Sequence, residues 1–562
     1  MSYGWIEVGP LLRLIAAVFY AMVIGFAAAR PARAVVSPKN GNFFIGYTDI
    51  SYGGDAELSL GRVYNSKSAF NGLFGWGWGS EYDTFLVAQP DGTIVVHESG
   101  GGASNVFTAV DRANSEIDGA LALISRAQPE LSAGDRERLR QDARFRHDTW
   151  ERVRSTSKVP EVIVPDNRSF VSHAFGEETL VHRGHEFVAT RADGRRRRFD
   201  ARGHLIEISH DHGTPLYLTY DEKRRLSHIS DGLRTITLVT DPAGRIVRAM
   251  GTNDRYAEYR YSPAGDLIWS RDAQGNVYAH EYSADGRHNM TRIGYSDGTS
   301  LVVWYYSVQA NEGVRRIRDR QGEITDYEYG ERNENGTDHL WSEYRISSPG
   351  GLPHKVRYDY FEAIDQITGS PSLVRTIQSV DGSEVDTTFD HHGSPTKVVR
   401  DGLATDYAYD ANSRLISKTS ASTRVSYSYS LAGKVSRVEI RSTRDAPSAA
   451  ARTWFSYEHD DRGALASAAS SDGRQIRLTN DASGRITTMR VGEKELQFDY
   501  AANSKPRKIT LAGVGSIEIT YADSGILRQT TGEQARRVSV EVAESYRLLM
   551  ELVRPSHVER EQ

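Results

Sequence analysis

Clusters of histidine and acid side chains are the residues with the most obvious chemical potential. His210-Asp211-His212 and Asp390-His391-His392 each place two imidazoles beside a carboxylate. Side chains at positions i and i+2 of a strand share a face, so two imidazoles could converge on a metal ion. These clusters, however, fall where turns or strand ends are expected, and polar side chains are usual there. His182-Arg183-Gly184-His185 is no stronger a candidate. We therefore expect no metal site.

Other catalytic chemistry has little support. The chain has no cysteine, which excludes disulfides, a thiol nucleophile and thiolate metal sites. It also lacks the G-x-S-x-G and H-E-x-x-H motifs and a phosphate-binding loop. No carboxylate pair for glycoside hydrolysis can be chosen from 74 acidic residues without a fold. We expect no catalytic residue and no cofactor, and a hydrolase is the weakest hypothesis.

Charge and aromatic content bear on binding. The run Arg195–Arg198 could contact phosphate or an acidic polysaccharide, but a solvated edge strand explains it more simply. A net charge of −5 argues against a nucleic-acid binder that works through bulk positive charge. The 29 tyrosines could stack on sugar rings, although most should pack across strands. A glycan thus stays among the candidate ligands, and nucleic acid does not.

A unit of about twenty residues recurs along the chain. Fifteen units align, at spacings from 20 to 31 residues. Clear members are FDARGHLIEI from Phe199, YDEKRRLSHI from Tyr220, YSPAGDLIWS from Tyr261, YDANSRLISK from Tyr409 and NDASGRITTM from Asn480. Such self-similarity predicts stacked copies of one small supersecondary element.

Each unit has the pattern of a β-hairpin. An alternating aromatic stretch, as in YAYD or YSYS, predicts a strand with tyrosines on one face. A D-x-x-G turn follows, and glycine suits a position with positive φ. Its glycines are Gly203, Gly244, Gly265, Gly286, Gly393, Gly433 and Gly484. A second turn is often Asp-Gly, at Asp231-Gly232, Asp297-Gly298, Asp381-Gly382, Asp401-Gly402 and Asp472-Gly473. A lone hairpin is marginal in water, so the hairpins should stack side by side into one long sheet.

The pattern Y-D-x-x-G-R-[LI] resembles the Rhs/YD-repeat family of bacteria, which is related to toxin-complex shells and teneurins. Ser37–Trp78 resembles the domain that begins many of these proteins, with Thr48-Asp49, R-x-Y-N-S at Arg62–Ser66 and Gly-aromatic-Gly-Trp at Gly75–Trp78. The stretch from His185 resembles the family's entry into its repeats. The resemblance covers about residues 36–530 and implies a β-spiral that encloses a hollow shell.

Two departures from the family pattern matter. Full members end in a core segment with a D-P-x-G-like self-cleavage site, followed by a variable toxin, and nothing after Tyr521 matches it. Asp241-Pro242 is an ordinary turn in the middle of the array. The resemblance therefore implies a short form without that core and toxin. Fifteen hairpins predict an open or partial shell.

Two stretches predict helices. Residues 111–158 carry no repeat, Ser132 and Asp135 have capping-box-like spacing, and the sparse apolar positions are Leu139, Phe145, Trp150 and Val153. We expect a peripheral helical insertion there. VEVAESYRLLMELVR places Val540, Val542, Tyr546, Leu548, Leu549 and Leu552 on a broad apolar helix face. That helix should dock either on its own sheet or against a partner.

The first residues have the layout of a secretory signal peptide. Arg13 precedes the apolar run Leu14–Ala29, and Ala32-Arg33-Ala34 predicts cleavage after Ala34. An uncleaved anchor is the alternative, but the run is short for the roughly 20 residues of a span. The predicted organisation is a signal peptide at 1–34, an Rhs N-terminal β domain at 35–110, a partly helical insertion at 111–165, the YD-repeat array at 166–530 and a helical tail at 531–562.

The sequence favours an exported, non-enzymatic scaffold or partial shell, which is periplasmic, on the cell surface or secreted. It would bind a partner protein, a cargo or a glycan, and the partner could be a second YD-repeat chain or a toxin. The alternative is a component of a polymorphic-toxin delivery system that acts on other cells, through residues 111–158 or 531–562. No membrane span is expected in the mature chain.

Overall fold

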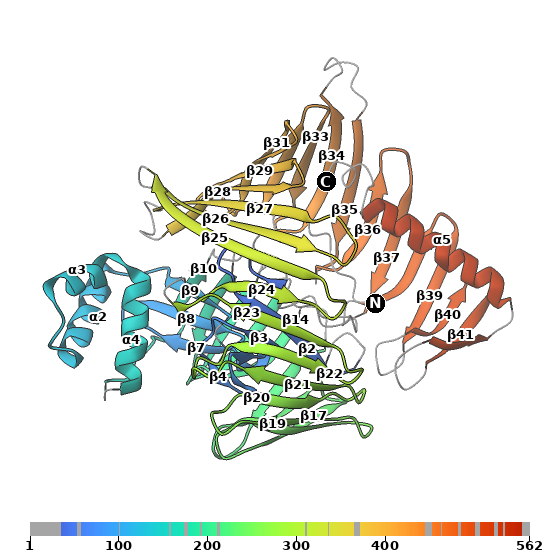
Figure 1. Ribbon diagram of the computed structural model, residues 1–562. Helices are drawn as coiled ribbons and strands as arrows, with labels where there is room; N and C mark the ends of the chain where they lie inside the picture. The colour runs from blue at the N-terminus through green and yellow to red at the C-terminus, as the bar shows by residue number, and fades with distance from the viewer. Residues whose placement is uncertain are drawn as a thin grey trace.

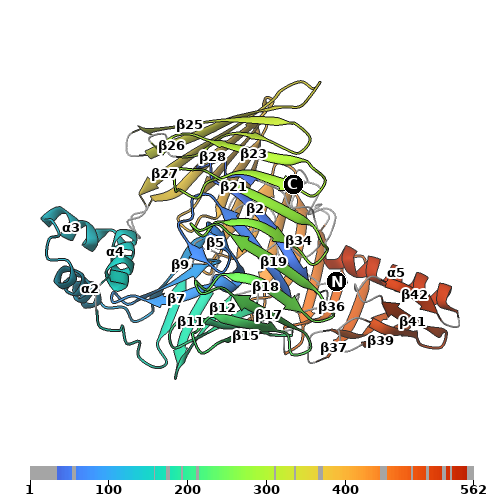
Figure 2. The ribbon, with the colours of Figure 1, turned by 60° about the horizontal axis from the view of Figure 1, so that its bottom comes forward.

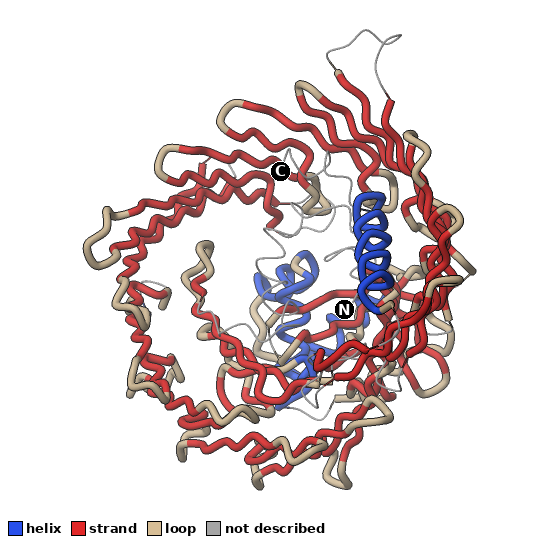
Figure 3. Tube along the Cα trace, turned by 90° about the vertical axis from the view of Figure 1, so that its right-hand side faces the viewer, coloured by secondary structure: helices blue, strands red, loops and turns tan. Residues whose placement is uncertain are grey.

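The computed structural model describes residues 35–553, apart from 53–57, 101, 157–158, 173–177, 192–193, 211–213, 309–311, 335–336, 365–370, 444–451, 462, 482–484, 501–505, 522–526 and 532–533. The predicted signal peptide, Gly484, Asp211 and His212 lie outside the described residues. One long antiparallel sheet curves around a smaller inner sheet and a C-terminal helix (Figures 1 and 3).

The inner sheet is built from the first strands of the described chain. They are β1 (Val35–Val36), β2 (Phe43–Ser51), β3 (Ser59–Asn65) and β6 (Trp78–Gly79), in that order, with a small hairpin of β4 (Asn71–Gly72) and β5 (Gly75–Trp76). A 3₁₀ turn, η1 (Glu81–Asp83), leads from it to the long sheet.

The long sheet follows chain order, each strand pairing with the next. Its first strands are β7 (Phe85–Ala88), β8 (Thr93–Glu98), β9 (Ala103–Ala109), β10 (Ser169–Ser172), β11 (Glu178–Arg183), β12 (Glu186–Arg191), β13 (Arg195–Asp200), β14 (Leu205–His210), β15 (Leu216–Tyr220), β16 (Leu226–Ser230), β17 (Thr235–Thr240), β18 (Ile246–Gly251), β19 (Tyr256–Tyr261), β20 (Leu267–Arg271), β21 (Val277–Tyr282), β22 (Met290–Tyr295), β23 (Ser300–Tyr305) and β24 (Val314–Arg318). The longest strands come next: β25 (Ile324–Glu334), β26 (Thr337–Ser347), β27 (His354–Ile364) and β28 (Pro371–Val380). The last are β29 (Ser383–Phe389), β30 (Pro395–Arg400), β31 (Leu403–Tyr409), β32 (Leu415–Ser420), β33 (Thr423–Tyr429), β34 (Val435–Ser442), β35 (Arg452–His459), β36 (Leu465–Ser470), β37 (Gln475–Asn480), β38 (Ile486–Val491), β39 (Lys494–Tyr500), β40 (Pro506–Leu511), β41 (Gly515–Tyr521) and β42 (Leu527–Thr531). The predicted mainly β array of stacked hairpins is confirmed.

The sheet is open, as predicted: within the described strands no register pairs β7 with β42. The outer edge of β7 is instead closed by the first repeat turn. The Leu86 amide donates to the Gly203 carbonyl at 2.8 Å, and Phe85 forms a bridge with His204. Gly203 has φ +87°, and a Cβ atom there would lie 2.0 Å from the Leu86 carbonyl oxygen. Glycine is therefore required at position 203 for two reasons: the turn needs a positive φ, and β7 approaches too closely for a side chain.

The second turns have the positive φ angles that their Asp-Gly pairs predict. Asp381 and Gly382 have φ of 47° and 97°, and Asp401 and Gly402 have 47° and 84°. Two successive positive φ angles are the requirement of a tight two-residue hairpin whose twist matches the flanking strands. Short hairpins at this edge keep the strands in register along the array.

The insertion forms three helices rather than one. They are α2 (Asn114–Ala127), α3 (Ala133–Gln141) and α4 (Ala143–Thr156), and they lie to one side of the sheet (Figures 1 and 2). Ser132 caps α3 by accepting the Asp135 amide at 3.0 Å. Leu139, Trp150 and Val153 are buried in the bundle core, as the sparse apolar positions predict.

The C-terminal helix α5 (Ala535–Val553) docks on its own sheet, which is one of the two predicted alternatives. It lies on the inner face and contacts β36, β40 and β41 (Figure 3). Val538, Leu549 and Leu552 are buried there, and the Tyr457 hydroxyl donates to the Leu552 carbonyl at 2.8 Å. Within the described residues, no helix has the length and apolarity needed to cross a membrane.

The expected edge position of Arg195–Arg198 is wrong. These residues form most of β13, which pairs with β12 on one side and β14 on the other. Arg197 is buried and binds Glu98 at 2.6 Å and Glu178 at 2.8 Å. Acidic side chains on neighbouring strands neutralise the run, which the chain order alone does not reveal.

Candidate functional site

The inner face of the long sheet falls into three zones (Figure 3). The inner sheet and β7–β24 share one hydrophobic cluster that runs in sequence from Val36 to Ile317. A second cluster runs from Leu415 to Leu552 and includes α5. Between them, among the described residues, the buried side chains of β25–β30 belong to neither cluster.

Several hairpins, including those at both borders of β25–β30, are joined by their tyrosine hydroxyls. Eight tyrosines donate to the first carbonyl of the preceding return strand: Tyr220 to Leu205, Tyr261 to Ile246, Tyr282 to Leu267, Tyr305 to Met290, Tyr329 to Val314, Tyr409 to Pro395, Tyr429 to Leu415 and Tyr500 to Ile486, at 2.7–3.0 Å. Asn480 replaces tyrosine in one unit and keeps the bond through its amide, 2.9 Å from the Leu465 carbonyl. We call this hydrogen bond the tyrosine staple.

In several units an Asp and the Arg four positions later also link the turn to the tyrosine of the next unit. Asp410 accepts the amide and the Nε of Arg414 at 2.9 and 2.7 Å. Burial alone would raise the pKa of Asp410, but the bonds from Arg414 lower it below its ordinary value. The Arg414 guanidinium then lies 4.7 Å from the ring centroid of Tyr429 in the next unit. The same arrangement recurs at Arg245 over Tyr261 and Arg485 over Tyr500.

One staple also holds the inner sheet. The Tyr282 hydroxyl accepts from Trp78 Nε1 at 3.0 Å while donating to the Leu267 carbonyl at 2.9 Å. We expect Tyr282→Phe to lower the free energy of unfolding by about 2 kcal/mol, because two buried polar partners lose their hydrogen bonds. Urea unfolding measures the loss. The matched control is Tyr256→Phe on the exposed face, which should stay within about 0.5 kcal/mol; equal effects would contradict the staple.

A buried ion pair anchors the inner sheet to the repeats. Arg62 Nε donates to Asp49 Oδ2 at 2.7 Å, and both side chains have zero exposure. Arg62 also donates to Ser270 Oγ at 2.8 Å, and the Tyr259 hydroxyl donates to Asp49 at 2.8 Å. Burial opposes the charge of Arg62, yet Asp49 raises its pKa above the ordinary value. The Thr48-Asp49 and R-x-Y-N-S motifs therefore build an interface inside the molecule.

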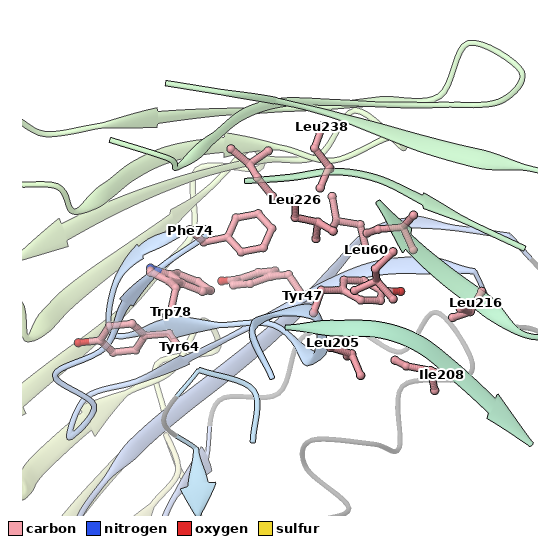
Figure 4. Close-up of a cluster of buried hydrophobic side chains, with 14 of the residues drawn as sticks. Tyr47, Leu60, Tyr64, Phe74, Trp78, Leu205, Ile208, Leu216, Leu226 and Leu238 are labelled. Carbon is pink, nitrogen blue, oxygen red and sulfur yellow. The ribbon is translucent and has the colours of Figure 1, made fainter. Parts of the chain in front are cut away.

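The Gly-aromatic-Gly-Trp motif docks on the repeat turns. A Cβ atom on Gly75 would lie 2.3 Å from the Gly265 carbonyl oxygen, so only glycine permits the approach. Trp76 donates to the Ala264 carbonyl at 3.0 Å and stacks on His288 at 4.6 Å. Figure 4 shows Trp78 beside Phe74, Tyr47 and Tyr64 in the inner layer, with leucines of the long sheet around them.

Asp83 is a buried carboxyl at the exit from the inner sheet. It accepts the amides of Leu73 and Ser80 at 3.1 and 2.9 Å. Burial nevertheless raises its pKa from 3.8 to about 7. The folded chain therefore holds a proton that the unfolded chain releases, and this contribution to stability falls as pH rises from about 4 to about 7. We expect Asp83→Asn to flatten that part of the stability profile, measured by urea unfolding across this pH range; a parallel profile would contradict the assignment.

The middle zone is rich in tyrosine and poor in charge. We define it as the shared face of Leu340, Ser342, Tyr344, Tyr358, Tyr360, Thr376, Gln378, Thr387 and Val398 on β26–β30. The Tyr344 and Tyr358 rings lie 6.0 Å apart at 22°, and Tyr327 of β25 lies 5.5 Å from Tyr344. Ser342 Oγ is buried without a hydrogen-bond partner within the described residues. An aromatic face with hydroxyl and amide groups suits recognition of another molecule.

The described residues of the histidine clusters lie in turns and strand ends, as expected. His391 and His392 are exposed, and Asp390 accepts the amides of His392 and Ser394 at 2.9 and 2.8 Å. His182 donates from Nδ1 to the Pro165 carbonyl at 3.0 Å. His210 ends β14. The repeat pattern predicts the Asp and Gly of the turn but not the hydroxyl staple or the arginine stack, for which Arg four positions after Asp is the signal in the sequence.

The chain is similar to one family model, one curated protein and several solved structures. Residues 34–105 match a domain of unknown function, DUF6531. This range contains β1 to β8 and the beginning of β9. The probable deoxyribonuclease RhsB of Dickeya dadantii (strain 3937) is 25% identical over 375 residues, or 65% of this chain and 22% of that protein. The crystal structures of TcdB2-TccC3-TEV and of TcdB2-TccC3 without its hypervariable C-terminal region give TM-scores of 0.41 and 0.37, at 11% and 12% identity. They align with 93% and 89% of this chain and with 29% and 28% of theirs.

The chain thus spans less than a third of the length of these relatives. Several of its YD units repeat the arrangement of Tyr429, Asp410 and Arg414, from the stapling tyrosine to the stacked arginine. Together with the DUF6531 match and the similarity to RhsB, these units support the resemblance to the Rhs/YD-repeat family that the sequence shows.

Proposed function

We propose that the chain is an exported, non-enzymatic scaffold, a partial shell that holds a partner protein or a cargo against the middle zone. The observation that carries the proposal is the difference between the three zones of the inner face. Two of them are filled by the chain's own inner sheet and its own helix α5. The middle zone has neither cover, and its half-buried Tyr344 and Tyr358 lie beside the buried Ser342 and Thr376.

The chemistry of the middle zone favours a polypeptide partner. Tyrosine supplies large rigid contact area at low conformational cost, and Ser, Thr and Gln supply adaptable hydrogen bonds. The middle zone as defined contains no ionised side chain, so a strongly charged ligand would gain little there. A glycan that stacks on the tyrosine rings is the competing ligand.

Photo-crosslinking in the native host tests the site. A benzophenone amino acid replaces Tyr358 in one strain and Tyr256, on the exposed face, in another. We expect a defined adduct at position 358 and none at 256, and mass spectrometry identifies the partner. Adducts of the same partner at both positions, or at 256 alone, would contradict the middle zone as the site.

Export through a signal peptide cut after Ala34 is part of the proposal. Support comes from β1 (Val35–Val36), which follows the proposed cut directly and pairs with β2. We expect the intact mass of the exported chain to equal that of a chain whose first residue is Val35. A chain that retains residues 1–34 outside the cytoplasm would contradict it. The organisation proposed from the sequence, with the array over 166–530, stays a proposal.

Toxin delivery is the second candidate function, because the curated relative is named a probable deoxyribonuclease. Here the chain would carry or dock an activity against other cells through its helical parts. Expression of the full chain and of a form without residues 531–562 distinguishes the two. Growth inhibition that depends on those residues would favour toxin delivery, and no inhibition by either form favours the scaffold.

A further inference from the structure

We propose that β25–β30 form a compliant seam at which the curved sheet opens and closes. The inference deepens the proposed function, because the seam carries the middle zone and its opening would admit the partner. The two flanking bodies each have an inner hydrophobic cluster: the first is shared by the inner sheet and β7–β24, and the second spans β32–β41 with α5 packed on β36, β40 and β41. A sheet that lacks a second layer is held in its curvature only by its own pairing and side chains.

The tyrosine staple fails twice in succession in the seam. The staples on either side are Tyr329 to Val314 and Tyr409 to Pro395. In other units the stapling tyrosine directly follows the register shift near the end of its strand, as Tyr409 follows the shift at Ala408/Tyr409. The same shift locates the equivalent residue in the strands between Tyr329 and Tyr409. The residues at that position are Glu362 in β27 and Phe389 in β29. Neither side chain has a hydroxyl to donate to the preceding hairpin.

An ion pair stands at the first of the two positions. Glu362 binds Lys39, in the turn between β1 and β2 of the inner sheet. The two side chains are 17% and 38% exposed, so water and salt reach the pair. Partly exposed ion pairs are screened by salt, unlike a buried hydroxyl–carbonyl bond. The pair therefore acts as a salt-sensitive latch between the first body and the seam.

The seam bends without breaking, because its strands stay paired on both sides of the register shifts at Glu362 and Phe389. β25 to β28 pair over ten or eleven residues each. On the opposite face Asp359 binds Arg357 at 2.8 Å and His339 Nε2 at 2.7 Å, which ties β26 to β27. Motion at the seam should thus change the curvature of the sheet while each hairpin stays paired.

Single-molecule energy transfer tests the seam directly. The chain has no cysteine, so Leu233→Cys and Leu431→Cys, at turn residues 65% and 110% exposed, take one dye on each body. We expect a narrow distance distribution at low salt that broadens at high salt. The Glu362→Gln variant should show a broad distance distribution already at low salt. Phe389→Tyr, which restores a hydroxyl at this staple position, should narrow the distance distribution at high salt.

Matched variants keep the test decisive. Glu281→Gln removes an ion pair with Arg292 inside the first body and should behave as the parent does. Lys39→Gln breaks the latch from its other side and should reproduce Glu362→Gln, with circular dichroism confirming that both variants fold. The seam is overturned if breaking the latch leaves the distribution unchanged, or if Glu281→Gln broadens it equally. If the dye distances respond to salt as expected but the partner binds outside the middle zone, the proposed function is overturned and the seam is not.

Discussion

Arg62→Met should be among the most destabilising single substitutions in this chain. It leaves Asp49 buried with its counter-charge gone, and the Ser270 hydroxyl loses the hydrogen bond that Arg62 donates to it. Removing one member of a buried ion pair costs about 3–5 kcal/mol, since the remaining charge has no compensation. Urea unfolding should show that loss, and limited proteolysis should cut the inner sheet first.

The control removes both charges together. Asp49→Leu with Arg62→Met leaves no uncompensated charge and should recover part of the stability lost by Arg62→Met alone. A double variant at least as unstable as the single variant would show that packing, rather than charge, dominates at this site. An unchanged Arg62→Met protein would contradict the anchoring role itself.

Gly203→Ala should be the second large effect. The residue has φ +87°, and the new Cβ atom would lie 2.0 Å from the Leu86 carbonyl oxygen on β7. Gly244→Ala is the matched control, because Gly244 has φ +90° but no neighbouring atom closer than 4.0 Å. We expect about 1–2 kcal/mol at Gly244 from backbone strain alone, and clearly more at Gly203.

The two glycine variants separate turn chemistry from edge closure. Hydrogen exchange of the Leu86 amide, which donates to the Gly203 carbonyl, should accelerate in Gly203→Ala and not in Gly244→Ala. Equal loss of stability in both variants, with Leu86 still protected, would mean that the first repeat turn does not close the β7 edge.

Local patterns predicted the repeating part of the fold. Alternating aromatics, D-x-x-G turns and Asp-Gly turns each have a backbone requirement, and their positive φ angles at Gly203 or Gly382 follow from it. The sequence also predicted helices around Ser132 and at the C-terminus. What it could not predict depends on contacts between distant residues: Arg62 with Ser270 is 208 positions apart, and Lys39 with Glu362 is 323.

The same limit explains the errors. Arg195–Arg198 resembled an exposed edge because nothing near it in sequence showed Glu98 facing Arg197. The middle zone was also missed. Its tyrosines follow the same alternation as those of the covered zones, and only the positions of the inner sheet and α5 distinguish them. Whether a tyrosine is core or binding surface is decided by which segment covers it.

Affinity for the crosslinked partner, purified and titrated against the folded chain, tests the central claim most directly. The account predicts that Tyr344→Ala with Tyr358→Ala weakens binding at least tenfold, while Tyr256→Ala on the opposite face leaves it unchanged. Equal affinity for all three proteins would show that the uncovered tyrosine face of the sheet is not where this scaffold holds its partner.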